Sequence, residues 1–203
     1  MTRILIPGRH PMLSIVATLR RIVFAVVVAS ISSIANGTEI ATASGVTHEA
    51  LFTPGDAVDR RIVALINGAR SEVLVQAYSF THRRIAQALI AAHRRGVRVL
   101  LVADRAQHLE TPGSVIDAIA RAGVDVRLEG RFAAAHNKIV VIDADSLDAT
   151  VITGSYNYTL AAQNRNAENA LVVRHDPPLA QRYRTNFIAL RDGAEPYPPS
   201  PRP

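Results

Sequence analysis

The chain has 203 residues, of which 48% are hydrophobic and 20% are charged. This is enough for one packed domain and excludes wholesale disorder. Because cysteine is absent, disulfides, thiolate metal sites and a cysteine nucleophile are all excluded. The formal net charge is +6, but residues 1–35 hold four of the 23 basic residues and none of the 17 acidic ones, so the remainder carries 19 − 17 = +2. Charge alone therefore gives only a weak indication of a polyanionic partner.

Residues 1–35 have the pattern of a secretory signal peptide. Two arginines precede an apolar run, Ile22–Ala29, and small residues follow up to Ala35,. The run is shorter than the roughly 20 residues of a membrane-spanning helix, so we expect cleavage after Ala35, with an uncleaved anchor as the alternative. The long basic region leaves Met12 as a second candidate start. We predict a periplasmic or secreted protein without stable membrane association after cleavage.

The rest of the chain alternates between strand-like and helix-like segments. Residues 36–47 are small and polar, which is typical of a linker, and residues 48–192 form the predicted domain. In chain order we expect a helix over Val58–Ala69, a strand over Glu72–Phe80, a helix over Arg84–His93, a strand over Val97–Ala103, a helix over Ser114–Ala122, strands over Val124–Leu128, Lys138–Ile142 and Thr150–Thr153, a helix over Thr159–Gln163, a strand over Asn169–Arg174 and a helix over Pro178–Leu190. Residues 193–203 are Pro-rich and are expected to be a disordered tail.

Several of the expected strands are continuous apolar runs that are separated by helices. This pattern predicts a single α/β domain whose sheet is mixed, largely parallel, and flanked by helices.

The segment AHNKIVVID contains His136, Lys138 and Asp143 in the spacing H-x-K-x4-D. Lys138 is the one lysine among the 23 basic residues, which suggests a position that needs a compact ammonium. In a strand, His136 and Lys138 point to the same face because the side-chain period is two. The sequence GSYN follows, with Ser155 and Asn157 in the same relationship.

These motifs resemble those of the phospholipase D superfamily, H-x-K-x4-D followed by G-S-x-N. The resemblance runs from about Glu49 to Leu190 and is greatest to the small, single-motif bacterial endonucleases exported to the periplasm. It implies a homodimer, because a complete site needs two motifs and each chain supplies one. More residues separate Asp143 from Gly154 than in related sequences, and the surplus is expected in a turn that leaves the strands in place.

The resemblance also implies the chemistry, which uses no metal and no cofactor. His136 of one subunit would attack phosphorus, and His136 of the other would protonate the leaving oxygen. Lys138, Ser155 and Asn157 would hold the phosphate oxygens.

Two carboxylates complete the implied set. Glu168 would accept a hydrogen bond from the imidazole and so fix its tautomer. Asp143 is counted with the catalytic residues, although support of the motif strand and its turn fits it better than contact with substrate. The remaining histidines, His82 among them, lack ligand spacing and are expected at the surface. Arg83 and Arg84 are expected on a solvated helix face, as a local patch for DNA backbone at most.

Three functions remain open on the sequence. The first is a metal-independent, sequence-nonspecific endonuclease acting on DNA, with RNA as a further candidate substrate, since no recognition helix is evident. The second is a phospholipase D-type hydrolase of phospholipid or cardiolipin. Its weakness is the low aromatic content of 5% and the absence of tryptophan,. The third is a catalytically silent binding module, which would not need a nucleophile.

Overall fold

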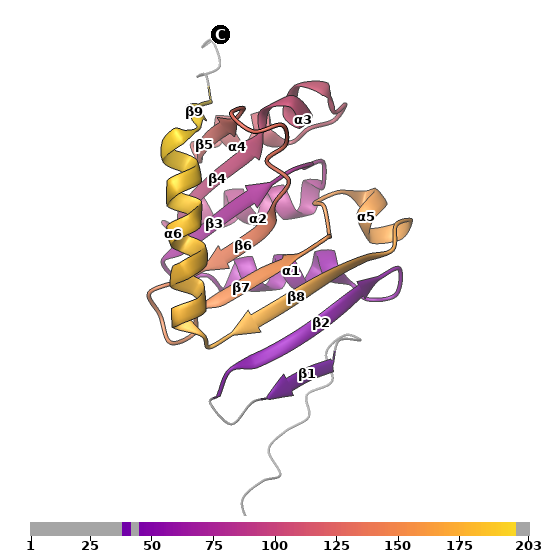
Figure 1. Cartoon of the computed structure of the whole chain (residues 1–203), viewed down its shortest axis with the longest axis vertical. Coiled ribbons are helices and arrows are strands. Elements are labelled where there is room, and N and C mark those ends of the chain that lie inside the picture. The colour runs from indigo at the N-terminus through magenta and orange to yellow at the C-terminus, as the bar shows by residue number, and fades with distance from the viewer. Residues whose placement is uncertain (1–37, 42–44, 198–203) are drawn as a thin grey trace, which may run out of the picture. The chain divides into compact units, whose positions relative to one another are not determined.

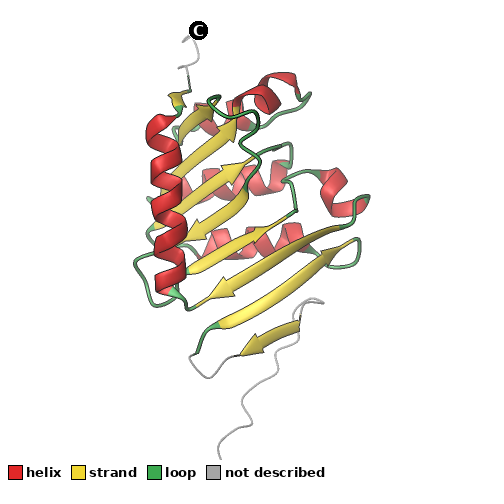
Figure 2. Ribbon diagram, viewed as in Figure 1, coloured by secondary structure: helices red, strands yellow, loops and turns green. Residues whose placement is uncertain are grey.

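The structure is a computed structural model that describes residues 38–41 and 45–197. The predicted signal peptide lies outside these residues. The described chain forms one nine-stranded sheet in the order β1-β2-β8-β7-β6-β3-β4-β5-β9, with helices on both faces (Figures 1 and 2). None of the helices in this part of the chain is long and apolar enough to cross a membrane.

The elements agree with most of the predicted segments. The strands are β1 (Thr38–Ala41), β2 (Thr47–Thr53), β3 (Glu72–Ala77), β4 (Arg98–Asp104), β5 (Asp125–Glu129), β6 (Lys138–Ile142), β7 (Thr150–Gly154), β8 (Glu168–Arg174) and β9 (Glu195–Pro196). The helices are α1 (Val58–Gly68), α2 (Arg83–Arg94), α3 (Arg105–Glu110), α4 (Ile116–Arg121), α5 (Leu160–Asn164) and α6 (Pro177–Gly193).

The strand directions correct one expectation. The α/β class and the mixed sheet are confirmed, but the expectation of a largely parallel sheet is wrong. The β3–β4 and β4–β5 pairs are parallel, and the other six pairs are antiparallel. A helical crossover returns the chain to the same edge of the sheet and makes parallel neighbours. Residues 130–137 contain no helix, and β6 returns antiparallel to β3 on the side away from β4.

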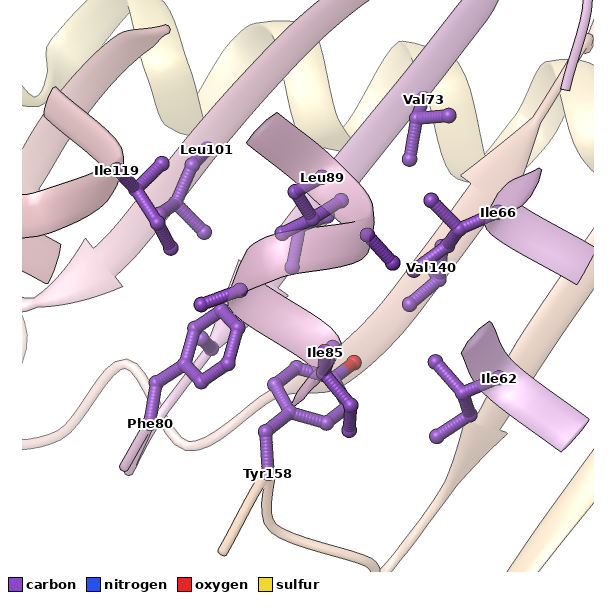
Figure 3. Close-up of a cluster of buried hydrophobic side chains, with 14 of the residues drawn as sticks. Ile62, Ile66, Val73, Phe80, Ile85, Leu89, Leu101, Ile119, Val140 and Tyr158 are labelled. Atoms are coloured by element: carbon purple, nitrogen blue, oxygen red, sulfur yellow. The ribbon is translucent and has the colours of Figure 1, made fainter. Parts of the chain in front are cut away.

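Two apolar layers cover the faces of the sheet. On one face α1, α2 and α4 contribute Ile62, Leu89 and Ile119 to a cluster with the sheet (Figure 3). On the other face α6 packs Phe187 in a second cluster that includes Val141. Because both faces are covered over the central strands, β3 and β6 are buried at every position rather than alternating,.

Short strands also occur in the segments predicted to be irregular. β1 lies within the expected linker, and β2 begins before the expected domain boundary. At the other end, β9 pairs with β5, and the hydroxyl of Tyr197 donates a hydrogen bond to Asp117 at 2.6 Å. Pro196 is compatible with this position because β9 is at the edge of the sheet. The ordered domain therefore extends beyond residues 48–192 on both sides.

Candidate active site

All the predicted site residues except Asp143 lie at one edge of the sheet, where β3 and β7 end and β6 and β8 begin. Lys138 opens β6, directly opposite Ala77 at the end of β3. A bridge between Phe80 and Tyr158 holds the segments after β3 and β7 side by side, and their rings meet edge to face at 5.2 Å (Figure 3). This pairing fixes the segment that follows β3 next to the segment that follows β7.

His136 and Lys138 form the closest pair in the site. His136 is exposed, whereas Lys138 is only 7% exposed. Nζ of Lys138 lies 3.0 Å from Nδ1 of His136 and donates to the carbonyl oxygen of the same histidine at 2.9 Å. An ammonium has only donors, so Nδ1 accepts and the proton of a neutral imidazole is on Nε2. Burial lowers the pKa of Lys138, and the nearby negative charge of Glu168 opposes this shift.

Tyr78, which the sequence analysis did not single out, packs against both members of this pair. Its ring centroid lies 4.2 Å from that of His136, and Nζ of Lys138 lies 4.7 Å from it. A cation over an aromatic face is attracted by the ring quadrupole. Tyr78 follows a buried strand that pairs with the motif strand, but only the pairing itself identifies it as a site residue.

Ser155 and Asn157 follow β7 and are positioned by Gly154. A Cβ at Gly154 would lie 2.3 Å from the backbone oxygen of Asn169, so no larger residue fits this approach of β7 to β8. Oγ of Ser155 accepts hydrogen bonds from the backbone nitrogen of Asn169 at 3.0 Å and from its side chain at 3.3 Å. Oδ1 of Asn157 is buried without a hydrogen-bond partner among the described residues. A buried polar atom without a hydrogen-bond partner indicates a bound ligand or a contact with a second chain.

Glu168 lies at the start of β8, but it does not contact the imidazole as the resemblance implies. Its Oε1 accepts from Nδ2 of Asn166 at 2.9 Å, and no hydrogen bond joins it to His136 within the described chain. The residue next to the imidazole is Lys138. Glu168 acts on the site through its charge, which favours the protonated form of Lys138.

Asp143 lies apart from the other site residues, at the opposite end of β6. Four residues lie between it and Lys138, and the five residue steps along the strand span about 17 Å,. Its carboxylate accepts from the backbone nitrogens of Arg70, Ser71 and Glu72 at 2.8–2.9 Å and from Oγ of Ser71 at 2.7 Å. Burial raises the pKa of this carboxyl, but the hydrogen bonds outweigh it and leave the pKa below its usual value. The geometry supports the structural role rather than a catalytic contact.

His82 differs from the expectation of a surface group. It is only 1% exposed, and Nε2 lies 3.4 Å from Oδ2 of Asp59. His82 lies directly before α2, where the chain passes from the active site to the helix, and this position buries its ring. Across the described residues, no group of three or more His, Asp or Glu side chains is arranged to hold a metal ion.

Comparison with known proteins identifies the family. A family model described as "Cardiolipin synthase, PLD-like domain" matches residues 62–191. The chain belongs to the phospholipase D-like family. Its resemblance to that superfamily, based on the two motifs, is thereby confirmed.

Relatives of this phospholipase D-like chain bear several names. The protein named phospholipase D of Rickettsia conorii is 37% identical over 137 residues, which are 68% of this chain and 66% of the relative. The mitochondrial cardiolipin hydrolase of Danio rerio is 31% identical over 137 residues, 67% of this chain and 58% of the relative. The chain thus spans less than two thirds of these relatives.

The structural neighbours agree with the family. The phospholipase D family member Nuc from Salmonella typhimurium superimposes with a TM-score of 0.70 at 30% identity, covering 76% of this chain and 99% of Nuc. NucT from Helicobacter pylori gives a TM-score of 0.67 at 21% identity, covering 75% of this chain and 99% of NucT. The second likeness concerns the fold alone.

Proposed function

We propose that this protein is a phosphodiesterase, namely a metal-independent, sequence-nonspecific endonuclease that cleaves DNA, with RNA as a further substrate, through a phosphohistidine intermediate. The observation that carries the proposal is the exposed imidazole of His136 beside the buried ammonium of Lys138. This pair combines a nucleophile with fixed positive charge, which phosphodiester cleavage needs. The similarity to Nuc over nearly all of that chain supports a nuclease over a lipase.

The proposed reaction has two steps. When the Lys138 ammonium turns to the phosphate, the proton of the His136 imidazole passes from Nε2 to Nδ1 through water, which frees the lone pair of Nε2. Nε2 then attacks phosphorus, the P–N bond forms, and the P–O bond to the leaving strand breaks as a second imidazole donates its proton to that oxygen. The second imidazole then takes a proton from water, whose oxygen displaces the histidine and releases the phosphomonoester. Lys138 and Asn157 hold the non-bridging oxygens, and Ser155 orients them. Asp143 fixes the strand that carries the motif.

The second imidazole comes from a second copy of the chain in this proposal. Phe52 on β2 is 60% exposed and Leu171 on β8 is 37% exposed. They are diagonal neighbours on one face, because Phe52 pairs with Asn169,. Asn169 also holds Ser155, so this apolar face adjoins the site. Sedimentation of the protein from residue 36 onward should give a dimer at assay concentrations. A fully active monomer would contradict the shared site.

Plasmid cleavage in excess EDTA tests the activity, with His136→Ala prepared in parallel. We expect nicking that resists EDTA and is absent from the variant. Acid-labile phosphate trapped on the wild type during turnover, and missing from His136→Ala, would identify the nucleophile. Phosphate on another residue would reassign it, and cleavage abolished by EDTA would contradict the metal-free reaction.

The alternative substrate is a phospholipid. It is favoured by the names of the curated relatives, phospholipase D and mitochondrial cardiolipin hydrolase. If a folded, dimeric protein leaves plasmid and RNA intact but hydrolyses cardiolipin vesicles, the lipid function replaces the nuclease.

A further inference from the structure

A large cavity lies next to the active site, between the start of α2 and α5. Its volume is about 720 Å³, within the usual range for small-ligand sites. Its walls include Thr81, Arg83 and Arg84 at the start of α2, and Asn164 at the end of α5. Of the described residues that line it, Leu160 is the one large apolar side chain. The site chemistry described above does not use this cavity.

The two chain segments that form the active site continue directly into the cavity. One runs from Tyr78, beside His136, to Thr81, and the other from Asn157 to Leu160. Three residues span at most about 11 Å. The backbone nitrogen of Thr81 also donates to the carbonyl of Tyr158 at 2.9 Å, which binds the two segments together. A ligand extending from His136 by one or two phosphate units can therefore reach the cavity.

The net charge of the cavity wall favours an anion, because its two arginines, Arg83 and Arg84, outnumber its one carboxylate, Asp59, which faces His82. Arg83 and Arg84 are exposed, and within the described chain neither forms an ion pair, whereas Arg61, Arg98 and Arg131 each pair with a glutamate. They occupy the first turn of α2, which has no acidic residue and no side-chain cap. The unpaired N–H groups and the dipole of a helix N-terminus attract negative charge.

His82 gives a second, independent sign of a ligand. It lines the cavity, it is 1% exposed, and its Nδ1 makes no hydrogen bond among the described residues. Burial lowers the pKa of His82 more than Asp59 raises it. Nε2 lies 3.4 Å from Oδ2 of Asp59, which leaves Nδ1 as the ring nitrogen without a partner among the described residues. A buried polar atom of this kind needs a hydrogen-bond partner from outside the chain. The hydroxyl and amino groups of a nucleoside are such partners.

We propose that this cavity binds a second phosphate and its attached nucleoside, in a nucleic acid strand whose scissile phosphate lies at His136. The proposal rests on the endonuclease function above and adds a subsite to it. Arg83, Arg84 and the first turn of α2 would hold the phosphate. A phospholipid fits the walls less well, because its acyl chains need an apolar route and the lining is mostly polar.

The test compares two substrates on two matched double variants. Arg83→Gln with Arg84→Gln removes the charge of the subsite, and Arg94→Gln with Arg121→Gln removes the same charge elsewhere. Arg94 lies at the far end of α2, about 16 Å away. The substrates are a single-stranded oligodeoxynucleotide and bis(p-nitrophenyl) phosphate, which carries one phosphate and cannot occupy both sites.

We expect the subsite variant to lose at least about tenfold in kcat/KM on the oligonucleotide, the loss of one charge-assisted contact. Its activity on bis(p-nitrophenyl) phosphate should stay at the wild-type level, and the control variant should keep both activities. Oligonucleotide binding by the subsite variant, in a His136→Ala background, should also fall less steeply with salt.

Each other result has a defined meaning. Unchanged oligonucleotide cleavage, or an equal loss on both substrates, would overturn the subsite. A loss confined to cardiolipin vesicles would overturn the nucleic acid assignment. If wild-type protein hydrolyses bis(p-nitrophenyl) phosphate but no nucleic acid, the proposed endonuclease function is wrong. If it hydrolyses neither substrate, the assignment of a phosphodiesterase site at His136 is wrong as well.

Discussion

The ammonium of Lys138 contacts both the ring nitrogen Nδ1 and the backbone carbonyl oxygen of His136, at 3.0 and 2.9 Å. One buried cation therefore fixes the orientation of the imidazole and the end of the loop that carries it. With Nδ1 accepting, Nε2 is the nitrogen that faces the substrate. Lys138 thus positions the histidine as well as supplying charge to the phosphate.

Lys138→Arg should lower kcat on bis(p-nitrophenyl) phosphate by about 100-fold or more, although the charge is kept. A guanidinium is planar and wide, and it cannot replace an ammonium that is enclosed by Tyr78 and His136. Circular dichroism should show an unchanged fold. Wild-type turnover by Lys138→Arg would refute the requirement for a compact cation.

Glu168→Gln should move the alkaline limb of the pH–rate profile to lower pH. Burial lowers the pKa of Lys138 and the charge of Glu168 raises it. Without that charge, Lys138 loses its proton at a lower pH, and activity is lost as the pH rises through this value. Asn166→Ala is the matched control, because it removes the hydrogen bond to Glu168 and keeps the charge. An unmoved limb in Glu168→Gln would show that Lys138 does not set it.

Tyr78→Ala should reduce kcat about tenfold, and Tyr78→Phe should leave it nearly unchanged. The ring, rather than the hydroxyl, packs against His136 and lies over Lys138, and such contacts are worth about 1 kcal/mol each. Steady-state kinetics on bis(p-nitrophenyl) phosphate measure both variants. Equal damage in the two would assign the role to the hydroxyl instead.

Asp143→Asn should lower the free energy of unfolding by about 2 kcal/mol at pH 7, because an amide cannot accept all the hydrogen bonds that the carboxylate receives. The pKa of Asp143 is depressed in the folded protein, so its contribution is present above the unfolded pKa of about 4 and is lost as the pH falls through the folded value. Urea titrations of wild type and variant should therefore converge in acid.

The same variant separates structure from catalysis. Activity per folded molecule should stay at the wild-type level, since Asp143 is at the far end of β6 from His136. A fall in kcat without a fall in stability would return Asp143 to the catalytic set.

Strong periodicity and the motifs allowed most of the fold to be predicted, while short or polar elements did not show in the sequence. α3 buries no residue, so it has no apolar stripe, and β2 alternates through polar positions such as Glu49 and Thr53. The direction of β6 depends on a helix-free connection, whose course the sequence does not reveal.

The site residues likewise divide into those that the sequence predicts and those that only the structure reveals. The sequence brings His136, Lys138, Ser155 and Asn157 together through their motifs. Tyr78 and the cavity at α2 become evident only when strands are paired, because their neighbours are distant in the chain. The buried His82 was likewise hidden, since one histidine before a helix is usually solvated.

The four residues between Lys138 and Asp143 span β6 from the catalytic edge of the sheet to the anchored one. The spacing between Lys138 and Asp143 in the motif therefore equals the length of one strand. Adding or removing one residue there would turn every later side chain to the opposite face and separate the anchor from the reacting group. Residues 144–149 form a turn that carries none of the site residues, so a change in its length would leave the spacing within the strand intact.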